Sequence, residues 1–193
     1  MTSPMEKVIE YLNSLSSLTP KERDLVRSIL IVKDVPKKEI LVRAGEISND
    51  IFFVNEGLLR LYFIDKEGKE QNKNFSAEDA FTASFASLLA RDKSNCYISS
   101  IEKTNLTIAD HSKFMQIADK SLSLQTCARK ILERVFLSKE KREYEFLMLS
   151  AQERYEAFVR DHSNLLTRIP NFHIASYLGI RPETLSRLQK ENS

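Results

Sequence analysis

The chain has 193 residues, enough for one medium domain and a small second one whose core needs no disulfide or metal. Its formal net charge is only +2, which excludes a protein that coats nucleic acid through bulk positive charge. The sequence contains no charged-then-apolar leader and no run of about 18 apolar residues, so we expect a cytoplasmic protein without contact to membranes. Its two cysteines, Cys96 and Cys127, are expected to be reduced thiols.

Two helices are expected at the beginning of the chain. Residues 5–16 form the first. The second is expected over residues 20–30, because Thr19 is a cap residue, Pro20 suits the first helical position and Glu22 completes a capping box.

A β-rich region follows from Val32 to about His111. Short runs of strand-forming residues there end at turn signals. The expected strands cover residues 38–43, 51–54, 58–64 and 69–75, with two more within 97–110. Many short strands at close spacing predict an antiparallel sandwich or jelly roll.

A long helix is expected over residues 121–149, since no glycine or proline interrupts this stretch. Its apolar residues at a four-three-four spacing make a narrow stripe, typical of the seam between two paired helices. The predicted dimer seam consists of Leu124, Ala128, Ile131 and Val135. The alternative is that this stripe packs on the chain's own β-rich region.

The end of the chain carries a helix-turn-helix pattern. Ser150 and Glu153 form a capping box, so one helix is expected over residues 150–162. Further on, a small residue marks a helix crossing, a glycine marks the turn, and apolar residues face inward on both sides. The predicted framework consists of Ile174, Ala175, Leu178, Gly179, Ile180, Leu185 and Leu188.

The outer face of the last helix predicts DNA as the ligand. Pro182 suits the first helical position. Arginine donates two hydrogen bonds to guanine and glutamate accepts one from cytosine, whereas hydroxyl groups and lysine more naturally bind phosphates. The predicted DNA-binding residues are Arg181, Pro182, Glu183, Thr184, Ser186, Arg187 and Lys190. The alternative is an ordinary helical hairpin.

The β-rich region, long helix and helix-turn-helix, in this order, resemble the Crp/Fnr family of bacterial transcription regulators. The residues that carry the resemblance in the first region are 38–45, 51–57 and 62–68, with their turn glycines, and Glu70. The resemblance implies an α+β fold: an N-terminal antiparallel β-roll (a double-stranded β-helix of the cyclic-nucleotide-binding type), a long dimerisation helix and a C-terminal helix-turn-helix domain. We expect a sensor domain over residues 1–118, the dimerisation helix over 119–147 and the DNA-binding domain over 148–193.

The resemblance also implies partners. They are double-stranded DNA, a second copy of the chain, RNA polymerase and a small-molecule effector that the sequence does not identify. Base-reading positions of the family correspond to Pro182, Glu183 and Arg187 here. Pro182 departs from the arginine of the prototype member, which implies a different operator sequence.

The effector pattern of the family is missing from this chain. Cyclic-nucleotide binders use a glycine-glutamate pair for the ribose and an arginine for the cyclic phosphate, because a buried phosphate needs an opposite charge. The corresponding stretch 77–89 has no glycine, and residues 94–97 stand where the phosphate-binding arginine is expected. We therefore expect no response to cyclic AMP, and the sequence predicts no cofactor.

Two other functions were compared with DNA binding. An enzyme is not expected: the three histidines, His111, His162 and His173, are too scattered for a metal site, and no nucleophile or phosphate-loop motif is present. The remaining rival is a sensor module of the same fold that binds a ligand or protein and no longer reads DNA.

Overall fold

The computed structural model describes residues 2–191 and contains two sheets and a series of helices. The strands are β1 (Leu30–Val35), β2 (Ile40–Val42), β3 (Asp50–Glu56), β4 (Leu59–Ile64), β5 (Glu70–Ser76), β6 (Phe81–Thr82), β7 (Tyr97–Ser100) and β8 (Thr104–Asp110). The helices are α1 (Pro4–Leu15), α2 (Pro20–Arg27), α3 (Phe85–Ala90), α4 (His111–Ala118), α5 (Leu122–Met148), α6 (Ala151–Asp161), α7 (Asn171–Leu178) and α8 (Pro182–Glu191), with a short 3-10 turn η1 (Ser163–Leu165).

The eight strands form two antiparallel four-stranded sheets, which we call the roll. Their orders are β1-β8-β3-β6 and β2-β7-β4-β5. The inner faces of the sheets bury a shared apolar cluster that includes Phe52, Leu59 and Ile98. The predicted fold class is therefore confirmed, with a long helix and C-terminal helices after an antiparallel roll.

Local sequence signals determine where helices begin and where the chain turns. Both predicted capping boxes form: Thr19 pairs with Glu22 and Ser150 with Glu153. α2 ends at Arg27, earlier than the predicted residue 30, because Leu30 already belongs to β1. α3 was not expected from the sequence.

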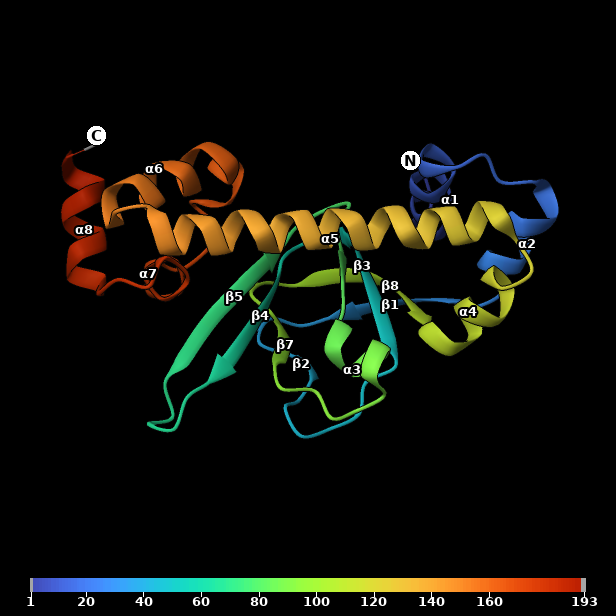
Figure 1. The fold of residues 1–193 in the computed structure, drawn as a ribbon, viewed down its shortest axis with the longest axis horizontal. Coiled ribbons are helices and arrows are strands. Elements are labelled where there is room, and N and C mark those ends of the chain that lie inside the picture. Colours follow the sequence, from blue (N-terminus) through green and yellow to red (C-terminus); the bar gives the residue numbers. More distant parts are fainter. Residues whose placement is uncertain (1, 192–193) are drawn as a thin grey trace.

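Figure 1 shows α5 running along the whole length of the molecule, with the roll below its middle. α1, α2 and α4 lie at one end of α5, where they share an apolar cluster with Leu124 and Cys127. α6, α7 and α8, which we call the head, lie at the other end. A third apolar cluster joins the head to Leu58, Phe75 and Ile101 of the roll, so head and roll share one core.

The described residues contain no helix long and apolar enough to cross a membrane. Both cysteines are buried free thiols. Within residues 2–191, no group of three or more metal-ligating side chains comes together.

Candidate functional site

α7, the turn and α8 pack as a pair of helices on a continuous apolar base. Five of the predicted framework residues are buried: Ile174, Ala175, Leu178, Leu185 and Leu188. Gly179 ends α7 with a φ of 66°, the left-handed conformation that only glycine adopts without steric cost. Ile180 is partly buried against the same cluster, and its N–H donates to the Ala175 carbonyl.

The other side of α8 is polar and open to solvent. Six of the predicted DNA-binding residues are exposed: Arg181, Pro182, Glu183, Ser186, Arg187 and Lys190. Thr184 is half-buried. The Arg187 side chain is 70% exposed and its one ion pair on the described surface, to Glu191 one helical turn later, is 3.9 Å long. Such a pair costs little to open, so the guanidinium is available to a ligand.

The head is held on the roll by a buried polar network around His173. Its Nδ1 lies 3.1 Å from Nη1 of Arg60 and 3.1 Å from Nδ2 of Asn72, both of which donate. Ser176 of α7 accepts from the Asn72 N–H and donates to the Glu70 carbonyl of β5. Burial, and then the Arg60 guanidinium, lower the pKa of His173 to about 4, although Glu70 opposes the shift. The imidazole is therefore neutral at neutral pH, and the one lone pair on its Nδ1 is shared between the two donors.

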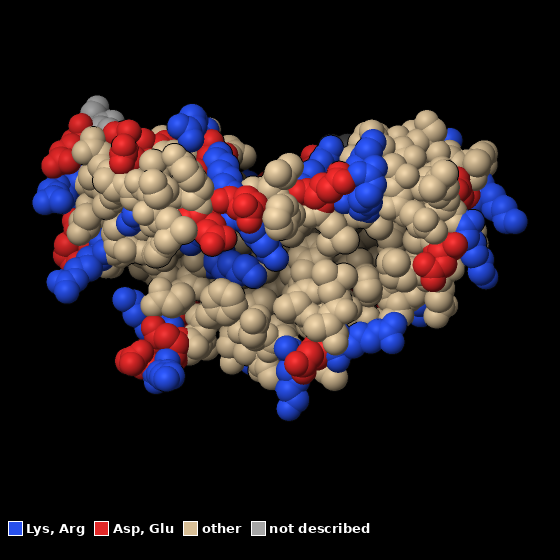
Figure 2. All heavy atoms as spheres, in the orientation of Figure 1, with Lys and Arg blue, Asp and Glu red and all other residues tan. Residues whose placement is uncertain are grey.

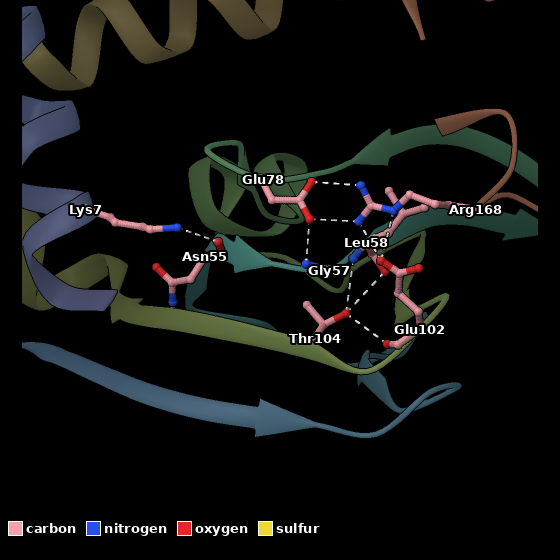
Figure 3. Close-up of polar contacts among 8 residues, drawn as sticks. All are labelled: Lys7, Asn55, Gly57, Leu58, Glu78, Glu102, Thr104 and Arg168. Atoms are coloured by element: carbon pink, nitrogen blue, oxygen red, sulfur yellow. Dashed lines mark hydrogen bonds and ion pairs between the residues drawn. The ribbon is translucent and has the colours of Figure 1, made fainter. Parts of the chain in front are cut away.

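A second polar contact between head and roll centres on Arg168, which precedes α7 (Figure 3). Its guanidinium donates to both oxygens of Glu78, at 3.0 and 2.8 Å, and to Glu102. Glu78 also accepts from the Gly57 N–H at 2.8 Å. Burial alone would raise the pKa of Glu78, but the hydrogen bonds from Arg168 and Gly57 outweigh it and lower that pKa to about 2. We call this contact the Arg168 clasp.

Gly57 makes the clasp possible at the backbone level. Its φ is 105°, and a Cβ there would lie 2.6 Å from Oγ1 of Thr104. Thr104 Oγ1 in turn accepts from the Leu58 N–H and lies 2.9 Å from the Glu102 carbonyl, to which it donates. This tight crossing brings Glu78 and Glu102, which lie apart in sequence, to the same place beside the head.

A cavity of about 800 Å³ lies between the roll and α5. Its roll side includes residues 79–86 together with Asn95 and Cys96, the segments where the sequence resemblance expects the ribose and phosphate ligands. The α5 side runs from Ile131 to Leu147, and His162 of the head reaches it as well. The volume is in the range of small-molecule sites.

The side chains in these two segments differ from a cyclic-nucleotide site. Ser84 and Ser94 hydrogen-bond to each other at 2.9 Å and are buried. Arg91, the nearby arginine of the sequence, is exposed at the end of α3 and does not line the cavity. Glu78, the one glutamate in the stretch 77–89, is occupied by the Arg168 clasp.

The predicted dimer seam on α5 needs a correction. Leu124 has no exposed surface and Ile131 packs against the same cluster of the chain's own N-terminal helices. Val135 lines the cavity, and Ala128 is half-buried. Leu124 therefore packs inside the chain, mainly on the N-terminal helices and not on the β-rich region of the alternative interpretation. Ala128, Ile131 and Val135 are only partly buried, and their place in a dimer seam stays a prediction.

A different side of α5 presents apolar residues to solvent. Its exposed apolar side chains are Leu132, Phe136, Leu137, Tyr144, Leu147 and Met148. At 3.6 residues per turn, Leu132, Phe136 and Leu147 lie on one line along the helix, away from Leu124 and Ile131. Lys139, Glu140 and Glu143 interrupt this line between Phe136 and Leu147, so the exposed apolar pair nearest the middle of α5 is Leu132 and Phe136.

Comparison with known proteins agrees with this architecture. Residues 32–121 match the family model of the cyclic nucleotide-binding domain. No curated protein sequence matches the chain.

Three solved structures illustrate the likeness of the fold. FixK2 from Bradyrhizobium japonicum has a TM-score of 0.76 and 17% identity over 84% of each chain. The c-di-GMP-responsive global regulator CLP from Xanthomonas campestris has a TM-score of 0.69 and 14% identity, over 90% of this chain and 91% of its own. A protein from Eubacterium rectale assigned to the crp/fnr family of transcriptional regulators has a TM-score of 0.72 and 19% identity, over 90% and 83%.

At these identities the likeness defines the fold. Residues 32–121 therefore resemble a cyclic nucleotide-binding domain, and the chain as a whole has the fold of these three structures.

Proposed function

We propose that the protein is a dimeric, DNA-binding transcription regulator of the Crp/Fnr type without enzymatic activity. The observation that carries this proposal is the exposed polar face of α8, supported from behind by the buried base of α7 and α8. Proteins with the same whole-chain fold include the global regulator CLP, which links signalling to virulence gene expression. α8 is accordingly the helix that enters the major groove.

The residues on this face have distinct proposed roles. Arg187 reads a guanine through its two terminal nitrogens, and Glu183 accepts from a cytosine or complements the helix N-terminus. Lys190 and the hydroxyl groups of Thr184 and Ser186 bind phosphates. Because a two-fold dimer presents two such helices, the operator is a pseudo-palindrome with half-sites about 34 Å apart.

The docking of the head gives the rival function its support. α7 shares a core with Phe75 of the roll and is tied down through His173 and Arg168, as a helix pair used only for packing would be. In that case the chain is a sensor module that does not read DNA. The exposed, charged side of α8 favours DNA binding, because packing alone needs no such face.

The experiment that separates the two starts with selection of bound fragments from random DNA by the purified protein. Fluorescence anisotropy then compares wild type with Arg187→Ala and Lys190→Ala on the selected and a scrambled duplex. Arg187→Ala is expected to cost about 1–3 kcal/mol on the selected duplex and to relax one base position in each half-site. Lys190→Ala is expected to weaken both duplexes alike and to reduce the salt dependence.

Arg160→Ala is the matched control, since Arg160 is an exposed arginine of the head that lies on α6. It should bind both duplexes as the wild type does. If Arg187→Ala binds the selected duplex as tightly as the wild type does, with the same preference over the scrambled duplex, the proposed base-reading role of Arg187 is wrong. A failure to select any sequence would favour the sensor module.

A further inference from the structure

The lining of the cavity between the roll and α5 contains more cations than anions. Four basic residues line it: Lys73, Arg134, Lys139 and Arg142. The acidic residues that line it are Asp79 and Glu143. Among residues 2–191, no ion pair within 4.0 Å joins any of the four cations to a carboxylate. The site therefore has a surplus of positive charge that the protein itself does not neutralise.

Lys73 is the cation that the roll contributes to this lining. It comes from β5, is half-buried, and its ammonium lies 5.4 Å from the centre of the Phe63 ring. Burial, and then repulsion from Lys139, lower its pKa. Two cations from the roll and from α5 thus face each other across the cavity, an arrangement that an anion between them would stabilise. Figure 2 shows blue and red side chains mixed along α5, above the mainly tan front of the roll.

The rest of the lining combines polar side chains with apolar and aromatic ones. Tyr11, Phe81 and Phe146 line the cavity, together with Ile131 of α5. Apolar walls with a few convergent charged groups are typical of sites for small organic molecules. A bare inorganic ion would leave most of this surface without contacts.

We propose that this cavity binds a small organic anion, in which a carboxylate or phosphate group contacts Lys73, Lys139 and Arg142 while an apolar body lies against the aromatic wall. Two of the three cations come from α5, and none belongs to residues 77–89 or 94–97, where the resemblance expects the ligands of a cyclic nucleotide. The proposed cations therefore lie outside those two segments, although the segments line the same cavity.

Arg142 connects this site with the head. Its Nη2 donates to the Tyr177 carbonyl of α7 at 2.7 Å, and its guanidinium lies 3.7 Å from the centre of the Tyr177 ring. An anion that recruits Arg142 competes with these contacts and changes how firmly α7 is held. This coupling rests on the proposed DNA-binding function, whereas the anion site itself does not.

The test uses two fluorescent probes of similar shape and the full chain. 8-Anilinonaphthalene-1-sulfonate carries an anionic group, and N-phenyl-1-naphthylamine is its neutral counterpart. Lys73→Gln and Lys139→Gln are each expected to weaken binding of the sulfonate roughly tenfold, since each removes one charge-assisted contact, and to leave the neutral probe unchanged. Lys66→Gln on the exposed hairpin and Arg129→Gln on the outer side of α5 are the charge-matched controls.

Competition then identifies the anionic group. 1-Naphthyl phosphate and 1-naphthoate are each titrated against the bound sulfonate, and the tighter competitor shows whether the cations prefer phosphate or carboxylate. Urea unfolding verifies that each variant is folded, and Lys139 is exposed enough that its replacement leaves the core intact. Equal binding of both probes, or sulfonate binding unchanged in Lys73→Gln and Lys139→Gln, would overturn the proposal. DNA binding is measured in a separate experiment. If the protein does not bind DNA, the probe titrations still test the anion site.

Discussion

At the scale of single residues, the contact between head and roll depends on His173 staying neutral. The folded pKa of about 4 lies below the ordinary value of 6.5, because burial and Arg60 disfavour the charged form. As the pH falls through this range, the unfolded chain binds a proton at His173 before the folded chain does. The contribution of neutral His173 to the free energy of unfolding is therefore complete above pH 6.5 and is lost progressively towards pH 4.

We predict that the free energy of unfolding falls by roughly 2 kcal/mol between pH 7 and pH 5 through His173 alone. The His173→Gln variant keeps an acceptor beside Arg60 and Asn72 but has no titrating group there. Its free energy of unfolding should therefore fall by less than that of the wild type between pH 7 and pH 5. Urea unfolding at the two pH values measures it. His111→Gln is the control, since burial also lowers the pKa of His111 but this residue lies outside the contact. An equal loss in His173→Gln and wild type would contradict the prediction.

The Arg168 clasp is predicted to be stronger than an ordinary surface ion pair. A double-mutant cycle of Arg168→Gln and Glu78→Gln should give a coupling energy of about 0.5–3 kcal/mol at pH 7. This contribution is present above pH 4.5 and is lost as the pH falls through about 2, because the pKa of Glu78 is lowered in the folded state. The matched cycle of Arg27→Gln and Glu6→Gln, a pair whose side chains are 38% and 39% exposed, should stay below about 1 kcal/mol. Equal coupling in the two cycles would show that the clasp is no stronger than a surface ion pair.

At the scale of secondary-structure elements, the turn between α7 and α8 depends on Gly179 for two reasons. Its φ of 66° strains any residue with a Cβ, and such a Cβ would lie 2.7 Å from the ring of Phe146 in α5. Gly68, with a φ of 79° and nothing within 4 Å, has the first constraint without the second.

We predict that Gly179→Ala lowers the free energy of unfolding by more than Gly68→Ala does. The strain of the left-handed conformation costs about 1–2 kcal/mol in both, and the displaced Phe146 ring adds to it in the first. Urea unfolding of the two variants gives the comparison. If the two losses are equal, the Phe146 ring moves away without cost and does not constrain the turn.

The apolar face of α5 is predicted to join two chains. Phe136→Asp together with Leu132→Asp places two charges in this face and should give a monomer, because a buried unpaired charge is costly. Light scattering coupled to gel filtration measures the mass against that of one 22.3 kDa chain. Ile47→Asp, at an apolar residue 69% exposed on the roll, is the matched control and should leave the dimer intact. If the wild-type protein has the mass of one chain at micromolar concentration, the prediction of a dimer is wrong.

What the sequence predicts and what it misses follow from the distance over which each signal acts. Capping boxes act within one helical turn, so the start of α2 and the start of α6 were predicted correctly. Periodicity along α5 detected an apolar stripe but not which of two apolar sides the rest of the chain covers. The partners of Arg168 and His173 lie 66 to 113 positions away in the chain, and only the folded topology brings them together.

At the scale of the whole molecule, cyclic AMP and cyclic GMP are predicted to bind feebly and DNA binding to need neither. The stretch 77–89 offers no glycine-glutamate pair for the ribose, and Arg91 lies outside the cavity lining. Calorimetric titration of each nucleotide tests this. A micromolar dissociation constant for either would contradict it.

The shared core of head and roll has a consequence for how such a chain changes over evolutionary time. Regulators of this architecture would gain new operators most simply by exchanging whole heads. In this chain, Leu58, Phe75 and Ile101 pack against the apolar residues of the head. Glu78 and Glu102 form ion pairs with Arg168. A foreign head would leave these apolar side chains uncovered and both carboxylates without a counter-ion. New specificity in this lineage is therefore expected to arise by point substitution on α8, with the contact surface behind it held constant.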